Sequence, residues 1–209
     1  MLKKEAIKIT GGLTKTTKMP CPSYSLPAQA CITGAKLRKI EGTPCNKCYA
    51  FKGNFNPKFR PAGHAARIRR LESLTHPQWV EAMTILIKGL PLFRWHDSGD
   101  LQGVWHLKNI FEVCELTPLT PHWLPTQERQ FLPLPGSKPP ENLLIRLSNA
   151  KNDTKPGNAW SHWSTVVTKP RAGHICPAPE QLDKKGRPHC KDCRACWSKD
   201  VYEVQYKIH

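Results

Sequence analysis

The sequence lacks a long apolar run. No hydrophobic stretch approaches the roughly 20 residues that a membrane-spanning helix needs, and the mean hydropathy of −0.52 is typical of a soluble chain. The first residues, MLKKEAIKITGG, contain lysines but not the apolar segment of a secretory signal peptide. We therefore expect the protein to stay in the cytoplasm, without a membrane partner.

Acidic residues are also scarce. The chain has 16 Asp and Glu against 32 Lys and Arg, a formal net charge of +16. Such an excess favours a polyanionic partner, most simply DNA or RNA. The residues expected to make these contacts are Lys36, Arg38 and Lys39 in AKLRKIEG, with Arg67, Arg69 and Arg70 in AARIRRLES. The alternative is a basic surface without a specific partner, in which ARIRRLES is the solvated face of a helix.

Disulfide bonds are not expected, although the chain has nine cysteines. A chain without an export signal meets the reducing cytosol, where thiols persist. Cys114 stands alone in the apolar helical stretch NIFEVCEL and is predicted to be a core residue. The other eight cysteines fall into two groups near the chain ends, which indicates metal ligands.

The C-terminal group is spaced like the ligands of an iron–sulfur cluster. Cys190, Cys193 and Cys196 form two consecutive CxxC steps in PHCKDCRACW, and Cys176 lies upstream, followed by Pro177. In ferredoxin-type sites, three sulfurs of a tight loop bind three corners of a 4Fe-4S cubane, and a distant Cys, often before Pro, binds the fourth. A single tetrahedral zinc more often takes two separated CxxC pairs. The spacing favours iron–sulfur, with zinc as the alternative.

The N-terminal group contains three cysteines, Cys31, Cys45 and Cys48, without an obvious fourth. Three thiols indicate either a second cluster with one open iron or ligands contributed to a shared site. Cys21, in MPCPSYSLPAQAC, is either the missing ligand or a structural thiol beside two prolines. We therefore expect one or two clusters.

Between these groups the pattern predicts an α/β core within a single domain. Helical periodicity is present at 76–90 and 101–116, and short apolar runs indicate strands at 92–99, 122–127, 143–150, 163–168 and 201–209. The alternation favours a mainly parallel sheet, either open or rolled into a TIM-barrel-like or partial (β/α) barrel. The domain divides into an N-terminal Cys-containing segment at 1–60, the core at 61–170, and a Cys-rich loop with the final strand at 171–209.

Polar residues follow the expected strands, where ligands bind in such folds. His96, Asp97 and Asp100 in WHDSGD are candidate catalytic residues, because two carboxylates and a His suit acid–base chemistry. The candidate cofactor-binding residues are Ser98, Gly99, Glu128 and Arg146. The alternative is structural, since Ser98 or Asp100 at the start of the helix 101–116 also fits an N-cap.

Six pieces of the sequence resemble a known family. They are KMPCPSYSLPAQAC, CNKCYAFKGNF, FRWHDSGDLQ, HWLPTQE, LIRLSNA and CKDCRACWS, and they run in order from about residue 18 to 198. Together they resemble the "gene product eighty-eight" domain family of phages and plasmids. The resemblance implies an origin in a mobile genetic element and conserved cysteines, without a biochemical role.

A second likeness is to the radical S-adenosylmethionine enzymes, which combine a full or partial (β/α) barrel with a three-Cys cluster. Cys31, Cys45 and Cys48 are similar to their cluster ligands, with a longer first gap than the usual C-x3-C-x2-C. SGDL at 98–101 is similar to the GGEPL stretch that holds the methionine amine in that superfamily. The likeness implies S-adenosylmethionine as a cofactor, with the C-terminal four-Cys set as an auxiliary cluster.

Three functions remain open from the sequence. The first is an iron–sulfur binding protein with a basic surface, which senses redox state or binds nucleic acid. The second is an enzyme that uses the WHDSGD carboxylates near a cluster, and the third is a zinc-stabilised nucleic-acid binder. Because a rolled sheet brings the chain ends together, we expect the loops before Tyr49 and Trp197 to lie near each other. The enzyme interpretation further requires Asp97 and Asp100 to lie near the cysteines.

Overall fold

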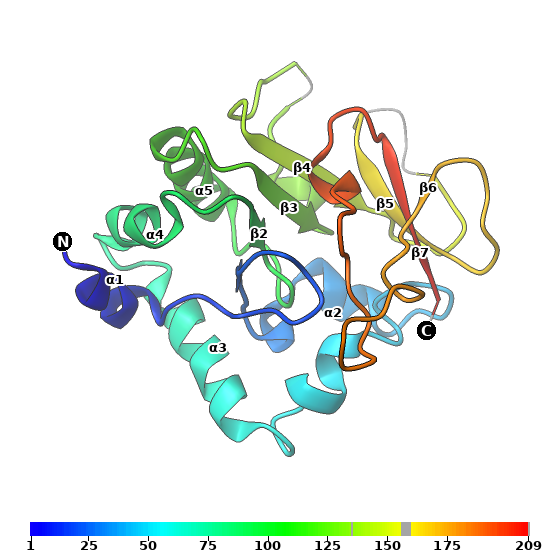
Figure 1. Ribbon diagram of the computed structural model, residues 1–209, viewed down its shortest axis with the longest axis horizontal. Helices are drawn as coiled ribbons and strands as arrows, with labels where there is room; N and C mark the ends of the chain where they lie inside the picture. The colour runs from blue at the N-terminus through cyan, green and yellow to red at the C-terminus, as the bar shows by residue number, and fades with distance from the viewer. Residues whose placement is uncertain (135, 156–159, 209) are drawn as a thin grey trace.

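The computed structural model describes residues 1–134, 136–155 and 160–208 of the chain. Its centre is a seven-stranded sheet, in which all strand pairs are parallel, in the order β1-β2-β3-β4-β5-β7-β6 (Figure 1). Within the described residues the sheet is open, because no strand pairing joins its edge strands β1 and β6. The predicted α/β class and parallel sheet are therefore confirmed.

The strands are short and the helices precede or separate them. The strands are β1 (Ser23–Tyr24), β2 (Phe93–Trp95), β3 (His122–Thr126), β4 (Leu143–Ser148), β5 (Trp163–Val167), β6 (His174–Ile175) and β7 (Glu203–Lys207). The α-helices are α1 (Lys3–Thr10), α2 (Thr33–Leu37), α3 (Pro61–Ser73), α4 (Trp79–Ile87) and α5 (Val104–Leu116). Short 3-10 turns lie at Ala28–Ala30, Tyr49–Phe51, Gly53–Phe55, Arg129–Phe131 and Ala195–Trp197.

The expected strands at 92–99, 122–127, 143–150, 163–168 and 201–209 correspond to β2, β3, β4, β5 and β7, and the two expected helices to α4 and α5. The strands β1 and β6 were not expected, because each is two residues long and lacks an apolar run. The sequence also predicts loops at 132–142 and 152–160 from their Pro, Gly and Asn content; of these, residue 135 and residues 156–159 lie outside the described residues.

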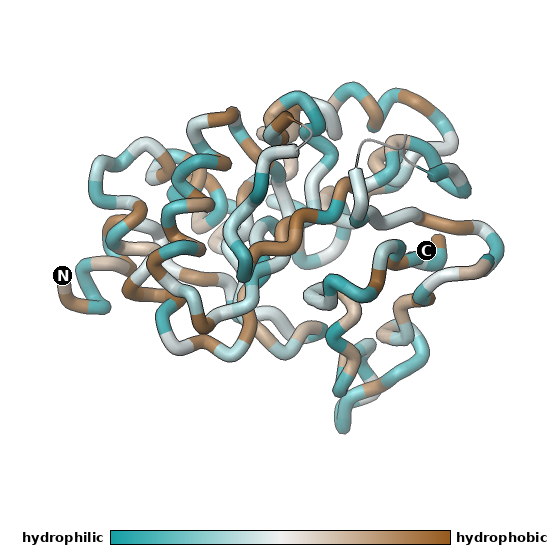
Figure 2. Tube along the Cα trace, turned by 90° about the horizontal axis from the view of Figure 1, so that it is seen from above, coloured by the Kyte–Doolittle hydropathy of each residue, from teal (hydrophilic) through white to brown (hydrophobic). Residues whose placement is uncertain are grey.

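Helices cover one face of the sheet. Trp79 and Met83 of α4 and Ile110 of α5 pack with Phe93 and Trp95 of β2 in a single buried cluster. Cys114 belongs to this cluster and is fully buried, which confirms its prediction as a core residue. Figure 2 shows that hydrophobic segments occur along the helices and through the centre of the molecule, while the loops on the C-terminal side are mostly hydrophilic.

The opposite face of the sheet carries a different set of side chains. Since neighbouring residues of a strand point to opposite faces, Arg94, Trp123 and Arg146 face away from the helices. The chain between β6 and β7 crosses this face, and Trp197 packs edge-on against Trp123 with ring centroids 5.2 Å apart. The Nε1 of Trp197 donates a hydrogen bond to the carbonyl of Phe93 at 2.9 Å.

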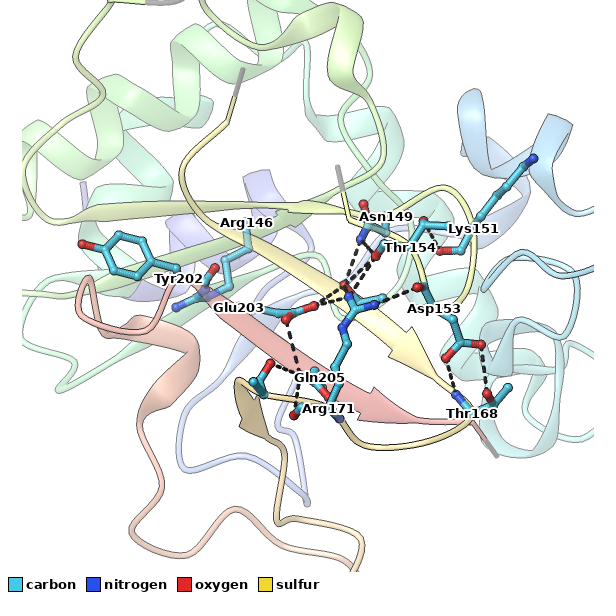
Figure 3. A network of polar contacts seen from close by, with 12 residues as sticks. Arg146, Asn149, Lys151, Asp153, Thr154, Thr168, Arg171, Tyr202, Glu203 and Gln205 are labelled. Carbon is cyan, nitrogen blue, oxygen red and sulfur yellow. Dashed lines mark hydrogen bonds and ion pairs between the residues drawn. The ribbon is translucent and has the colours of Figure 1, made fainter. Parts of the chain in front are cut away.

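A network of polar side chains links β5 and β7 to the loops beside them (Figure 3). Arg171 lies at its centre and forms a salt bridge with Glu203 of 2.6 Å. The hydroxyl of Thr165 donates to the same carboxylate at 2.8 Å and accepts from the Asn149 amide at 2.8 Å. Gln205 donates to the carbonyl of Ala172 at 2.9 Å. In this part of the sheet, hydrogen bonds therefore hold the neighbouring loops to the strands.

No helix in the described residues is long and apolar enough to cross a membrane.

Three histidines are buried among the aromatic side chains of the core: His96, His106 and His122. Burial lowers the pKa of His106 and of His122 to about 3. The ring of His122 stacks on Trp95, and its Nε2 lies 2.9 Å from the hydroxyl of Thr117. The fold therefore requires these imidazoles to be neutral.

We predict that acid destabilises the protein through these histidines. A His whose folded pKa lies below its unfolded value of about 6.5 contributes stability that is lost as the pH falls below 6.5, because the unfolded chain takes up the proton first. Between pH 8 and pH 5 the free energy of unfolding should fall by about 2 kcal/mol for each such His. Urea unfolding at both pH values measures this. Between these pH values, the His122→Asn variant should lose about 2 kcal/mol less stability than the wild type. An equal loss in both proteins would contradict the low pKa of His122.

Two candidate metal centres

Eight of the nine cysteines gather in two groups, and all nine are free thiols. The edge thiols are those of Cys31, Cys45 and Cys48, which lie close enough for their charges to act on one another. The face thiols are those of Cys21, Cys176, Cys190, Cys193 and Cys196, linked in the same way through Cys190 and Cys196. The two groups of cysteines along the sequence are therefore also two groups in space, with Cys21 in the second.

The edge thiols lie at the carboxyl edge of the sheet, because their segment follows β1. Glu128, which follows β3, holds that segment: its carboxylate accepts from the backbone N–H groups of Ile32 at 3.0 Å and Thr33 at 2.8 Å. The hydroxyl of Thr33 donates to the same carboxylate at 2.6 Å. Glu128 is fully buried. A residue predicted to bind a cofactor thus positions the chain directly after Cys31.

Asp100 joins the turn after β2 to the end of β3. Its carboxylate accepts from the backbone N–H of Leu101 and of Gln127, both at 2.8 Å, and from the hydroxyl of Thr126 at 2.6 Å. Burial raises the pKa of Asp100 to about 7, although these hydrogen bonds oppose the shift. The helix α5 starts at Val104. Asp100 therefore connects two loops and does not cap that helix.

The turn at Ser98 and Gly99 packs tightly against the chain that leads to the edge thiols. The hydroxyl of Ser98 donates to the carbonyl of Leu26 at 2.7 Å, and the N–H of Leu26 donates to the carbonyl of Ser98 at 2.9 Å. Gly99 has φ +75°, and a Cβ there would lie 2.5 Å from the Cβ of Leu26. This close approach requires glycine.

Of the two acidic residues of WHDSGD, Asp100 lies near the edge thiols, and Asp97 contacts the residue that follows Cys48. Burial raises the pKa of Cys45 to about 12, and the charges of Cys48 and Asp100 add to the shift. The carbonyl of Asp97 accepts a hydrogen bond from the hydroxyl of Tyr49, the residue after Cys48. The carboxylate of Asp97 accepts from the hydroxyls of Ser23, at 3.0 Å, and Ser25. The carboxylate of Asp97 is therefore bound by residues of β1 and the chain after it, and only Asp100 acts directly on the edge thiols.

His96 points into the core instead of toward the carboxyl edge. It is 3 % exposed, and its ring lies 5.2 Å from that of His106. Neither ring nitrogen has a hydrogen-bond partner within the described residues. Its φ of +51° is a left-handed conformation that a non-glycine residue adopts at a cost of about 1–3 kcal/mol. The structure thus separates His96 from Asp97 and Asp100.

The face thiols are anchored to the sheet by backbone hydrogen bonds from both ends of the chain. The N–H of Cys176 donates to the carbonyl of Gln205 at 2.8 Å, and the N–H of Cys190 donates to that of Lys18 at 2.9 Å. The Sγ of Cys193 lies 3.5 Å from the Nε2 of His174, and the Sγ of Cys196 lies 3.4 Å from the hydroxyl of Tyr206.

Cys21 belongs with the face thiols, which the sequence left open. Burial raises its pKa to about 12, and the charges that act on it come from Arg94, Cys190, Cys196 and Arg194. The edge thiols therefore number three, and the face thiols five.

Arg146 holds the segment that carries Cys196. It is fully buried and donates to five carbonyls, those of Ala195, Cys196, Ser198, Val201 and Tyr202, at 2.7–3.3 Å. The structure thus places this candidate cofactor-binding residue beside the face thiols, and its donors are engaged by the protein.

Arg94 is a functional candidate that the sequence analysis missed. Its guanidinium lies 4.5 Å from the ring centroid of Trp123, and its Nη1 lies 3.1 Å from the Sδ of Met19. Its charge acts on the thiols of Cys190 and Cys196 and, from the other side, on Tyr49. An arginine in the middle of the apolar strand FRW was the available signal. Arg94 thus lies within reach of both the Tyr49 side chain and the face thiols, while the expected proximity of the loops before Tyr49 and Trp197 stays a prediction.

Neither Arg94 nor Arg146 forms a salt bridge among the residues that the structure describes. Both charges act on the thiol of Cys196, whose pKa burial raises to about 12. A cation held out of water beside neutral thiols is costly unless negative charge compensates it. The face thiols therefore lie in a site suited to carry negative charge.

No three His, Cys, Asp or Glu side chains of the described chain are gathered closely enough to hold one metal ion.

Two of the three arginines predicted to contact nucleic acid from AARIRRLES are buried, so this part of the prediction is wrong. Arg67 is 8 % exposed and donates to the carbonyl of Phe55 at 2.8 Å. Arg70 is 7 % exposed and donates to the carbonyl of Gly12 at 2.7 Å. Their long side chains pack α3 against the N-terminal segment instead of facing solvent.

The fold and the two groups define a cysteine-rich α/β protein with thiols at one edge and on one face of a parallel sheet. The chain matches the family described as Gene product 88 over residues 1–199. It therefore belongs to this family, as the six sequence pieces implied. No curated protein and no solved structure shows significant similarity to it.

We predict that Arg146→Met destabilises the protein by at least about 3 kcal/mol, because it leaves several buried carbonyls without donors. Urea unfolding measures the loss. Arg129→Met, at an exposed arginine, is the matched control and should change stability by less than about 0.5 kcal/mol. Equal effects of the two substitutions would show that the five hydrogen bonds contribute nothing specific.

Proposed function

We propose that the protein is an iron–sulfur protein with two 4Fe-4S sites on a partial (β/α) barrel. Cys176, Cys190, Cys193 and Cys196 are the ligands of one cluster, on the face of the sheet. Cys31, Cys45 and Cys48 are the ligands of the other, at the carboxyl edge, which leaves one iron open. The guanidinium groups of Arg94 and Arg146, which form no salt bridge in the described residues and whose charges act on the thiol of Cys196, carry this proposal.

The charges support it as follows. Thiols with raised pKa values are neutral at pH 7 unless a metal removes their protons, which metal binding does. Four thiolates around a cubane give the face site a net negative charge. Arg94 and Arg146, together with Lys18, lie close enough to the face thiols for their positive charges to compensate it. Such nearby cations also tune the reduction potential of a cluster.

Trp197 and Tyr49 each follow the last ligand of a group. Trp197 packs against Trp123, and Tyr49 packs edge-on against Phe55 with ring centroids 5.4 Å apart. In this proposal both rings limit the access of water and oxygen to the sulfurs beside them.

We predict that the two clusters are lost separately. Cys193→Ala should lose the iron of the face site and retain that of the edge site, and Cys45→Ala should do the reverse. Iron per chain and visible absorbance after anaerobic purification measure both. Cys114→Ala, in the core, should keep all iron, and Cys21→Ala should also keep it if the other four face thiols are the ligands.

Two results would overturn the proposal. One is full iron content in the Cys193→Ala variant. The other is a colourless wild-type protein with one zinc for each thiol group, which would favour the zinc-stabilised alternative.

A second candidate function is the cleavage of S-adenosylmethionine at the edge site. The observation that favours it is the packing of the turn Ser98–Asp100 against the chain that leads to Cys31. When bound, a cubane with an open iron supplies one electron to a sulfonium ligand there. In this candidate Ser98, Gly99 and Asp100 line the position of the methionine amine, and Glu128 keeps Cys31 in place.

We predict that the anaerobic protein, with excess dithionite as the electron donor, converts S-adenosylmethionine to methionine and 5′-deoxyadenosine, the deoxyadenosyl radical taking its hydrogen atom from a C–H donor such as a buffer component. Cys45→Ala should abolish this conversion, because it removes a ligand of the edge cluster. Cys193→Ala should retain a part of it. Chromatography of the products measures the yield. A protein that contains both clusters and forms no deoxyadenosine would exclude this candidate and leave the iron–sulfur proposal intact.

A further inference from the structure

A belt of positive charge surrounds the edge thiols. Within residues 31–60 the chain has one acidic residue, Glu41, and seven basic residues, all exposed. These seven form what we name the basic collar: Lys36, Arg38, Lys39, Lys47, Lys52, Lys58 and Arg60. None of them takes part in a salt bridge among the described residues. The collar thus presents uncompensated charge to solvent.

The collar lies at the carboxyl edge of the sheet. Lys47 stands between Cys45 and Cys48, and the charges of Arg38 and Lys52 act on the thiol of Cys48. Figure 1 shows this segment, in light blue and cyan, along the lower side of the molecule. Its Gly42 carbonyl accepts from the N–H of Asn152, which follows β4, at 2.8 Å.

Aromatic rings alternate with these charges. Tyr49 is 52 % exposed and Phe59 is 73 % exposed. The guanidinium of Arg38 lies 4.3 Å from the ring centroid of Phe51. Phe59 and Arg60 line a shallow hollow together with Asn54 and Pro61. Exposed rings among cations are the features on which unpaired bases stack while their phosphates are neutralised.

The same segment is poorly suited to reading a duplex. Its α-helix α2 has five residues, too short to project into a major groove, and the described segment holds no pair of strands. Arg67 of α3 supports the collar from behind, because it donates to the carbonyl of Phe55 at 2.8 Å. Stacking on Phe59 requires bases that are already unpaired.

We infer that the basic collar binds single-stranded nucleic acid and presents it to the edge thiols as the substrate of that site. The part concerning the substrate rests on the proposed function, whereas binding itself does not. The phosphates contact the lysines and arginines, and a base stacks on Phe59 in the hollow beside Arg60. The half-buried edge thiols belong to the protein segment that contacts the nucleic acid, so they lie beside the bound strand.

The test measures the binding of a dye-labelled single-stranded RNA of about 16 nucleotides by fluorescence anisotropy at several salt concentrations. The collar variant is Lys36→Glu, Lys39→Glu, Lys52→Glu. Its matched control is Lys3→Glu, Lys4→Glu, Lys8→Glu, which reverses three exposed charges on α1. The collar variant should bind the RNA about 100-fold more weakly than the wild type. The slope of the logarithm of its binding constant against the logarithm of the salt concentration should be smaller in magnitude by about 2. The affinity of the control should stay within about threefold of that of the wild type.

A second pair tests stacking. Phe59→Ala should weaken binding about tenfold, the loss of one stacked base, whereas Leu119→Ala, at a leucine that is 92 % exposed, should change nothing. Single-stranded DNA of the same sequence shows whether the 2′-hydroxyl is read. An unlabelled duplex should compete at least tenfold less well than the single strand.

The inference is overturned if the α1 control loses as much affinity as the collar variant, if Phe59→Ala binds like the wild type, or if the duplex competes equally. Iron content is measured on every variant. Collar variants that keep their iron and lose binding support the inference. A wild type without iron that still binds through the collar would overturn the proposed function and the substrate role, and leave the binding surface.

Discussion

The guanidinium of Arg146 ties the chain between β6 and β7 to the sheet. It is fully buried and donates to five carbonyls between Ala195 and Tyr202. These bonds hold the turn of Cys196 against β4, and with it the ring of Trp197 against Trp123. The position of Cys196, and of the Trp197 ring that follows it, therefore depends on one side chain.

The period of two along a strand divides the molecule into two environments. In β2, Phe93 and Trp95 enter the helix-covered core, while Arg94 between them faces the thiols. A parallel sheet also brings the ends of β1, β2 and β3 to one edge, where Asp100 and Glu128 join the loops by hydrogen bonds. The core, the face site and the edge site thus follow from a single sheet.

The sequence predicted the elements whose patterns are local. Apolar periodicity located α4 and α5, and apolar runs located β2 to β5 and β7. Cysteine spacing separated the two thiol groups. Contacts between segments that are distant in the sequence could not be predicted from such patterns. Cys21 joins the face thiols because its chain passes beside Cys190, and Arg67 turns inward to Phe55. The buried roles of Asp100 and Glu128 depend on backbone N–H groups, which leave no mark in the side-chain pattern.

The strand order β5-β7-β6 has a consequence for how the protein is built. The last strand along the chain lies between its two predecessors, so β6 has no partner in the sheet until β7 has been synthesised and inserted. The N–H of Cys176 bonds to Gln205 of that strand. Ribosome-bound chains that end before β7 can therefore form the helix-covered core and the edge loops, but not the face site. The backbone pairing that positions Cys176 is therefore made only after residues 203–207 have been synthesised.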